Sequence, residues 1–128
     1  MIGQTIFDKI ESGEYCAAVI CSTLSCLKRA LRDTQEFKFL CRYVSKDDII
    51  NRIKEVSTRP VEGDYRHPGD DALTVYVLAI WDTYPEALQE AADAIHKDSK
   101  NYYWLRILWD EINKKFDQTH EYFEKKLQ

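Results

Sequence analysis

Glycine and proline are scarce in this chain of 128 residues, which holds 4 glycines and 3 prolines. Four of these seven residues fall between positions 60 and 69, so helix-breaking residues are sparse elsewhere. The sequence also lacks the alternation of apolar and polar residues that marks half-buried strands. It therefore predicts an all-α fold with one long break near its middle.

Long apolar runs are missing as well. No stretch of about 18 uninterrupted apolar residues occurs, which excludes a membrane-spanning helix. The segment from Met1 to Ile10 lacks the basic flank and apolar core of a secretory signal. Cys16, Cys21 and Cys26 would point in different directions on a helix and have no partners at zinc-ligand spacing. We expect a cytoplasmic protein with reduced cysteines and with neither cofactor nor metal.

Positive charge is short in the second half of the chain, where residues 70–128 carry 12 Asp and Glu against 7 Lys and Arg. The net charge of the whole chain is −4. Such a surface repels a phosphate backbone and attracts a basic protein, so we expect a protein partner, with a basic one favoured, and no nucleic acid. The basic residues of the first half are interleaved with acids and are interpreted as an ordinary solvated surface. They are Lys28, Arg29, Arg32, Lys38 and Arg42.

Apolar residues recur every three or four positions through most of the sequence, which is the spacing of amphipathic helices. The predicted helices cover residues 2–10, 14–31, 37–44, 49–56, 70–84, 85–95 and 101–116. Breaks fall at Gly13, Ser45, Pro85 and near Gln118, and Ser45 is expected to cap the next helix. We expect one all-helical domain over residues 1–128, built from three to four antiparallel helical hairpins, with a long loop at about 57–70 between two halves.

The segment from Asp82 to Ile95 resembles the inter-helix turn and second helix of HEAT-type repeats. In that family an Asp precedes a Pro by three residues, as Asp82 precedes Pro85, and a helix rich in small residues follows. Leu88 stands where the family usually has an Arg, and Tyr84 where it often has an Asp. We expect Asp82 to accept hydrogen bonds from free N–H groups of the turn. The resemblance implies a HEAT-like right-handed superhelix that binds protein without catalytic residues. An irregular helical bundle is the alternative, because its hairpins have similar spacing.

Each histidine follows an aspartate by three residues, a spacing at which helical bundles present metal ligands. The three pairs are Asp64 with His67, Asp93 with His96, and Asp117 with His120. Because no bridging carboxylates are evident on facing helices, the pairs are interpreted as loop and helix-end residues. The loop at 57–71 is interpreted as a crossover with a helix cap at Asp70 or Asp71, and no catalytic residue is assigned there.

Aromatic residues concentrate in the acidic half, in greater number than one helical stripe can bury. Exposed Trp and Tyr often anchor protein interfaces. We therefore predict a protein-binding module, of adaptor, inhibitor or immunity-protein type, that uses an acidic aromatic surface. The predicted contact residues are Trp81, Tyr84, Glu86, Glu90, Asp93, Tyr102, Tyr103 and Trp104. Two alternatives remain open: a small enzyme or ligand-binding protein that uses the 57–71 loop, and a homo-oligomer joined through the same aromatics.

Overall fold

The fold is all-helical, as the sequence predicts. The computed structural model describes residues 2–12, 23–58, 68–95 and 105–114, and these residues contain helices and short connections without a strand. The named elements are α1 (Ile2–Glu11), α3 (Leu24–Arg32), α4 (Gln35–Tyr43), α5 (Lys46–Ser57), α6 (Pro68–Thr83), the short 3₁₀ helix η1 (Pro85–Ala87) and α7 (Leu88–Ala94). A further helical stretch covers 105–114.

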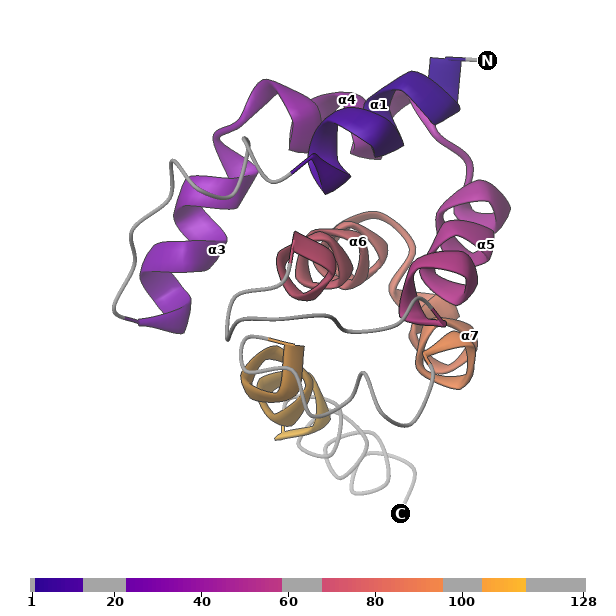
Figure 1. Cartoon of the computed structure of the whole chain (residues 1–128). Coiled ribbons are helices and arrows are strands. Elements are labelled where there is room, and N and C mark those ends of the chain that lie inside the picture. Colours follow the sequence, from indigo (N-terminus) through magenta and orange to yellow (C-terminus); the bar gives the residue numbers. More distant parts are fainter. Residues whose placement is uncertain (1, 13–22, 59–67, 96–104, 115–128) are drawn as a thin grey trace.

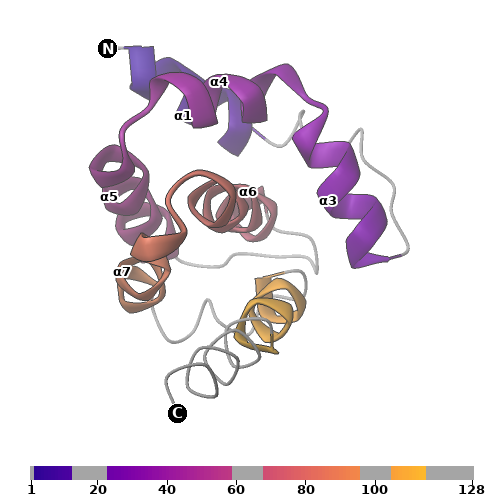
Figure 2. The same cartoon turned by 180° about the vertical axis from the view of Figure 1, so that it is seen from behind.

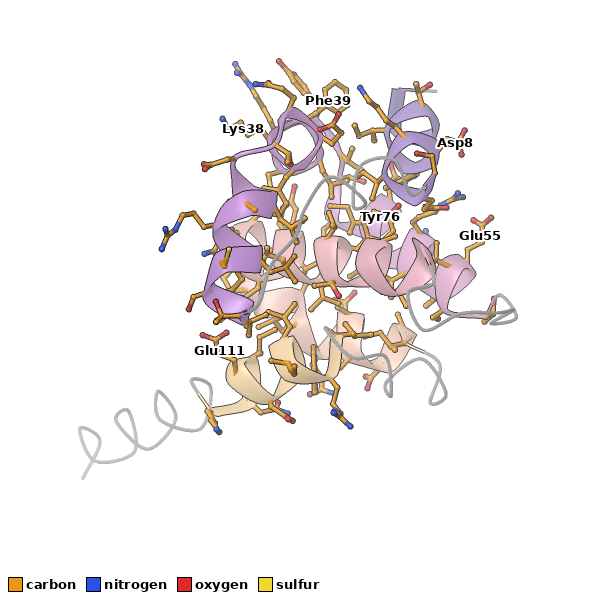
Figure 3. The ribbon with its side chains drawn as sticks, turned by 60° about the vertical axis from the view of Figure 1, so that its left-hand side comes forward. Asp8, Lys38, Phe39, Glu55, Tyr76 and Glu111 are labelled. Atoms are coloured by element: carbon orange, nitrogen blue, oxygen red, sulfur yellow. The ribbon has the colours of Figure 1, made fainter. Side chains whose placement is uncertain are left out.

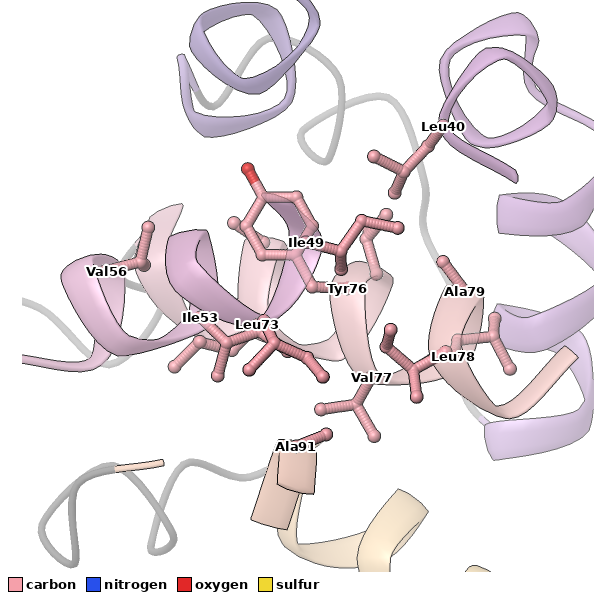
Figure 4. Packing of buried hydrophobic residues seen from close by; sticks show 14 of the residues in the cluster. Leu40, Ile49, Ile53, Val56, Leu73, Tyr76, Val77, Leu78, Ala79 and Ala91 are labelled. Carbon is pink, nitrogen blue, oxygen red and sulfur yellow. The ribbon is translucent and has the colours of Figure 1, made fainter. Parts of the chain in front are cut away.

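Helix α6 lies at the centre of the molecule. Figure 1 shows it nearly end-on, with α1, α4, α5 and α7 around it, and all four contact it. Every residue from Ala72 to Ile80 is buried, including the polar Thr74. A helix that is apolar on all sides has to be covered on all sides, so the sequence of α6 explains its central place. Figure 4 shows its side chains packed against Leu40 of α4, Ile53 of α5 and Ala91 of α7.

Helices α4 and α5 cover the predicted second pair of segments, but each packs on α6 more than on the other, so the predicted hairpin is not confirmed. Phe37, Leu40 and Val44 are buried on the first, and Ile49, Ile50, Ile53 and Val56 are buried on the second. Ser45 caps α5, since its hydroxyl accepts a hydrogen bond from the Asp48 N–H at 3.2 Å. The break at Ser45 and the two apolar stripes are thus confirmed.

The predicted helix over 14–31 is wrong in its extent. Helix α3 begins only at Leu24, because the Thr23 backbone is extended and its hydroxyl accepts from the Cys26 N–H at 3.2 Å. The apolar spacing runs through this cap, which is why periodicity alone does not reveal it. Leu27 and Leu31 are buried as expected, whereas Gly13 and residues 14–22 lie outside the described part.

The start of α6 also differs from the prediction. The helix begins at Pro68, not at Asp70 or Asp71, so these acids lie within its first turn. Proline is tolerated there because the first N–H groups of a helix have no intrahelical acceptor. Pro68 therefore opens a helix at a point where it was expected to interrupt one.

The turn at Pro85 exists, but Asp82 does not cap it. Pro85 opens η1, which leads directly into α7 beside α5 (Figure 2), and no side chain caps η1. The Asp82 carboxylate instead accepts two hydrogen bonds from Arg32 of α3, each at 2.8 Å. The distant guanidinium is a stronger partner for a carboxylate than a single backbone N–H. A relationship to HEAT-type repeats stays a prediction.

Candidate functional site

Three of the predicted contact residues form a row on the outer side of η1 and α7. Glu90 and Asp93 are three residues apart on one side of α7, Glu86 lies in η1 four residues before Glu90, and all three are exposed. We call them the acidic stripe. The opposite side of the same segment is buried through Ala87, Leu88, Ala91, Ala94 and Ile95. The segment is therefore anchored in the core while its carboxylates face solvent.

Two members of the acidic stripe have polar neighbours. The Lys46 ammonium lies 3.4 Å from Glu90, with both side chains partly exposed. The Gln89 side-chain amide donates to Asp93 at 3.0 Å across one helical turn. Both interactions lie at the surface, so they orient the carboxylates while leaving them accessible to a partner.

The predicted aromatic anchors lie in different surroundings. Trp81 is half-buried, and the Lys28 ammonium lies 5.4 Å from the centroid of its ring. Tyr84 is half-buried where α4 meets α5, and its hydroxyl donates to the Val44 carbonyl at 3.4 Å. Tyr84 thus immediately precedes the acidic stripe, whereas Trp81 faces α3. The other predicted anchors, Tyr102, Tyr103 and Trp104, lie outside the described residues.

A second surface, which the sequence analysis missed, lies on the outer side of α4. Tyr43 is 62% exposed, the highest among the large hydrophobic residues described. The Phe39 ring lies against it, with centroids 4.9 Å apart, and the Arg42 guanidinium lies 5.3 Å from its centroid. Lys38 projects from the same helix beside Phe39 (Figure 3). We call Lys38, Phe39, Arg42 and Tyr43 the basic aromatic face.

The cations of this face are free to act on a partner. Among the described residues, no carboxylate lies within ion-pair distance of Lys38 or Arg42. The signal in the sequence is the spacing: Lys38 with Arg42, and Phe39 with Tyr43, are each four residues apart and lie off the buried stripe of α4. Asp33 and Glu36 are interleaved with these cations in the sequence, and they concealed the spacing of the basic residues.

An open hollow borders the basic aromatic face between α4 and the end of α6. Its lining includes Lys38, Cys41, Arg42 and Thr83, with the Arg32–Asp82 pair at its edge. The hydrogen bond to Asp82 raises the pKa of Arg32, so this cation stays charged and occupied. Burial raises the pKa of Cys41, which keeps the thiol neutral at neutral pH and unreactive. The hollow therefore offers positive charge at its rim and no nucleophile.

A buried polar cluster joins α1, α5 and α6 on another side of α6. The Arg52 guanidinium donates to both carboxylate oxygens of Glu11, at 2.7 and 2.6 Å, and the Tyr76 hydroxyl donates to the same carboxylate. The side chains of Arg52 and Glu11 are 7% and 8% exposed. The Phe7 ring covers the cluster, with Arg52 5.4 Å from its centroid and Tyr76 edge-on at 5.5 Å. We call Glu11, Arg52 and Tyr76 the buried triad.

The buried triad has the electrostatics of a structural link. Burial, reinforced by the hydrogen bond to Glu11, raises the pKa of the Tyr76 hydroxyl. The hydrogen bond to Glu11 raises the pKa of Arg52. Tyrosine thus stays protonated and arginine stays charged at neutral pH, so neither serves as a general base or nucleophile. Sequence reasoning missed the triad, although its signal is an arginine inside the apolar run of α5.

The residues considered for metal binding or catalysis are not assembled into a site in the described part of the chain. No group of three or more His, Cys, Asp or Glu side chains able to hold a metal occurs among these residues. The three histidines, and Asp64 and Asp117 that precede two of them, lie outside them. Ser57, at the start of the 57–71 segment, is buried with its hydroxyl 3.3 Å from the Ala94 carbonyl, which ties α5 to α7.

Comparisons with known proteins give no relative from which a function could be inferred. No helix among those described is both long and apolar enough to cross a bilayer. No protein-family model, curated protein or solved structure matches this chain. The two exposed surfaces, the acidic stripe and the basic aromatic face, are therefore the features from which a function can be argued.

Proposed function

We propose that this chain is a cytoplasmic protein-binding module that engages a basic protein through the acidic stripe and the aromatic residues near it. The observation that carries the proposal is the row of three exposed carboxylates on a segment whose other side is anchored in the core. Such a row needs no rearrangement before it meets a partner. Tyr84 immediately before the row supplies the kind of side chain that anchors interfaces.

Charge supports the choice of a basic partner. The net charge of −4 adds to the local field of the acidic stripe, so a cationic protein is attracted from a distance and then oriented by the carboxylates. Cys41 is a reduced thiol, which agrees with a reducing compartment.

The test is retention of binding proteins by the immobilised chain and by two charge-reversed variants. Glu86→Lys with Glu90→Lys reverses the stripe. Asp33→Lys with Asp110→Lys makes the same change of net charge at two exposed acids, one at the C-terminal cap of α3 and one on the 105–114 helix. We expect a protein retained by the native chain and by the control variant to be lost from the stripe variant, and titration calorimetry with the purified partner to show at least a tenfold loss of affinity. Equal retention by all three chains, with unchanged circular dichroism, would refute the proposal.

A further inference from the structure

The acidic stripe and the basic aromatic face adjoin one another. Val44 directly follows α4 and contacts Tyr84, the residue before the stripe segment, while Lys46 begins α5 and contacts the stripe itself. The Tyr84 hydroxyl reaches the Val44 carbonyl at 3.4 Å, and the Lys46 ammonium reaches Glu90 at 3.4 Å. Positive and negative surfaces therefore meet at the junction of α4 and α5.

The charges of the two surfaces have matching spacing. Lys38 and Arg42 are one helical turn apart on α4, and Glu86 and Glu90 are also four residues apart. On one α-helix, as for Lys38 and Arg42, this spacing is roughly 6 Å, whereas Glu86 lies in η1 and Glu90 in α7, which follows it directly. With α4 of one molecule beside η1 and α7 of another, the two cations can thus face the two carboxylates.

The aromatic residues of α4 supply the apolar centre that charge pairs alone do not give. Tyr43 is 62% exposed, and its ring contacts both the Phe39 ring and the Arg42 guanidinium. Trp, Tyr and Arg are the residues most enriched at the energetic centre of protein interfaces. An exposed tyrosine beside two cations that form no ion pair among the described residues is typical of a contact surface.

We propose that the occupant of the basic aromatic face is a second copy of this chain. Lys38 and Arg42 of one copy pair with Glu86 and Glu90 of the other, and a two-fold axis near Tyr43 makes the same pairing in reverse. Adjacent surfaces of opposite charge are self-complementary under two-fold symmetry, the commonest symmetry of protein dimers. The inference rests on the proposed function, since the dimer covers the acidic stripe and a basic partner has to compete with the second copy for it.

The experiment measures the mass of the full chain in solution by light scattering and sedimentation over a range of micromolar concentrations. We expect the mass to rise toward two chains with concentration and to fall back in about 0.5 M salt, where exposed charge pairs are screened. Lys38→Glu with Arg42→Glu, and separately Glu86→Lys with Glu90→Lys, should each give monomers. An equimolar mixture of the two variants should give a dimer again, because each then carries the charge that the other needs.

Several results would overturn the inference. These are a native chain that stays monomeric at all concentrations, charge-reversed variants that dimerise like the native chain, and folded variants whose mixture remains monomeric. Where a charge reversal prevents folding, Tyr43→Ser provides the test instead. Because Tyr43 is exposed, this substitution should leave the fold intact. An increase of about tenfold or more in the dimer dissociation constant supports the inference, and no increase refutes it. A monomeric native chain that still loses its partner in the stripe variant would refute the dimer and leave the proposed function standing.

Discussion

Arg52 is a charged residue on the buried side of α5, between Ile49 and Val56. It is accommodated because Glu11 satisfies two of its N–H groups and Glu55 accepts a third bond at 3.0 Å. The two carboxylates differ in surroundings: the Glu11 side chain is 8% exposed and that of Glu55 is 61% exposed. Their contributions to stability should differ accordingly.

Replacing Glu11 by Gln should lower the free energy of unfolding by about 3 kcal/mol, because a buried guanidinium and the Tyr76 hydroxyl lose their charged acceptor. Glu55→Gln, which neutralises the exposed partner of the same arginine, should cost less than about 1 kcal/mol. Urea unfolding of both variants at neutral pH measures the difference. Equal losses would show that the buried triad does not link α1 to α5 and α6 in the way its geometry indicates.

The sequence predicts the structural roles of some single residues and not of others, for physical reasons. Ser45 is recognisable as a cap because an apolar helix pattern ends before it and another begins after it. Thr23 cannot be recognised as a cap, since the apolar spacing of Ala17, Ile20 and Leu24 continues through it. Arg52 was missed although its spacing from Ile49 and Val56 places it on the apolar side of α5, because an arginine on an amphipathic helix is normally expected on the solvent side.

At the scale of elements, α7 reaches the core through small side chains. Ala91 is fully buried where α7 packs on α5 and α6, whereas Gln89 on the same helix is exposed. Ala91→Leu should lower stability by about 2 kcal/mol, since interiors at native density have no room for three more carbons. This corresponds to a fall of roughly 6 °C in Tm.

The matched control is Gln89→Leu, which inserts the same side chain on the solvent side of α7 and should change stability by less than about 0.5 kcal/mol. Thermal unfolding followed by circular dichroism measures both. A native-like Tm for Ala91→Leu would mean that α7 is loosely packed, and the acidic stripe would then lack the rigid support argued above.

The sequence predicts the helices well and their arrangement poorly. Amphipathic helices such as α4 and α5 reveal their buried sides by spacing, and the acidic stripe follows as the solvent side of its helix. Helix α6 is apolar on all sides, so its pattern shows that it is buried without indicating which neighbour covers which side. The basic aromatic face was missed because its cations are mixed with acids whose partners, such as Lys9 for Glu36, come from elsewhere in the fold.

At the scale of the whole molecule, α3 is joined to distant parts of the chain by ion pairs. Lys28, in the middle of α3, lies 2.9 and 3.0 Å from the two carboxylate oxygens of Glu111 on the 105–114 helix, and Figure 3 labels Glu111 close to α3. Arg32 binds Asp82 at the end of α6. These pairs span 83 and 50 residues of sequence, so the position of α3 depends on the second half of the chain.

Asp82→Asn should therefore loosen α3 and leave the turn at Pro85 intact. Losing the charge of a two-bond pair at a partly exposed site costs about 1 kcal/mol, which should speed hydrogen exchange of α3 amides about fivefold. Asp93→Asn, at an exposed position of α7, should leave α3 unchanged. Exchange that increases only around residues 85–88 would indicate the opposite, namely that Asp82 acts as the helix cap expected from the HEAT-type resemblance. Because the two roles place the effect 50 residues apart, site-resolved exchange of this one variant distinguishes a long-range ion pair from a local turn.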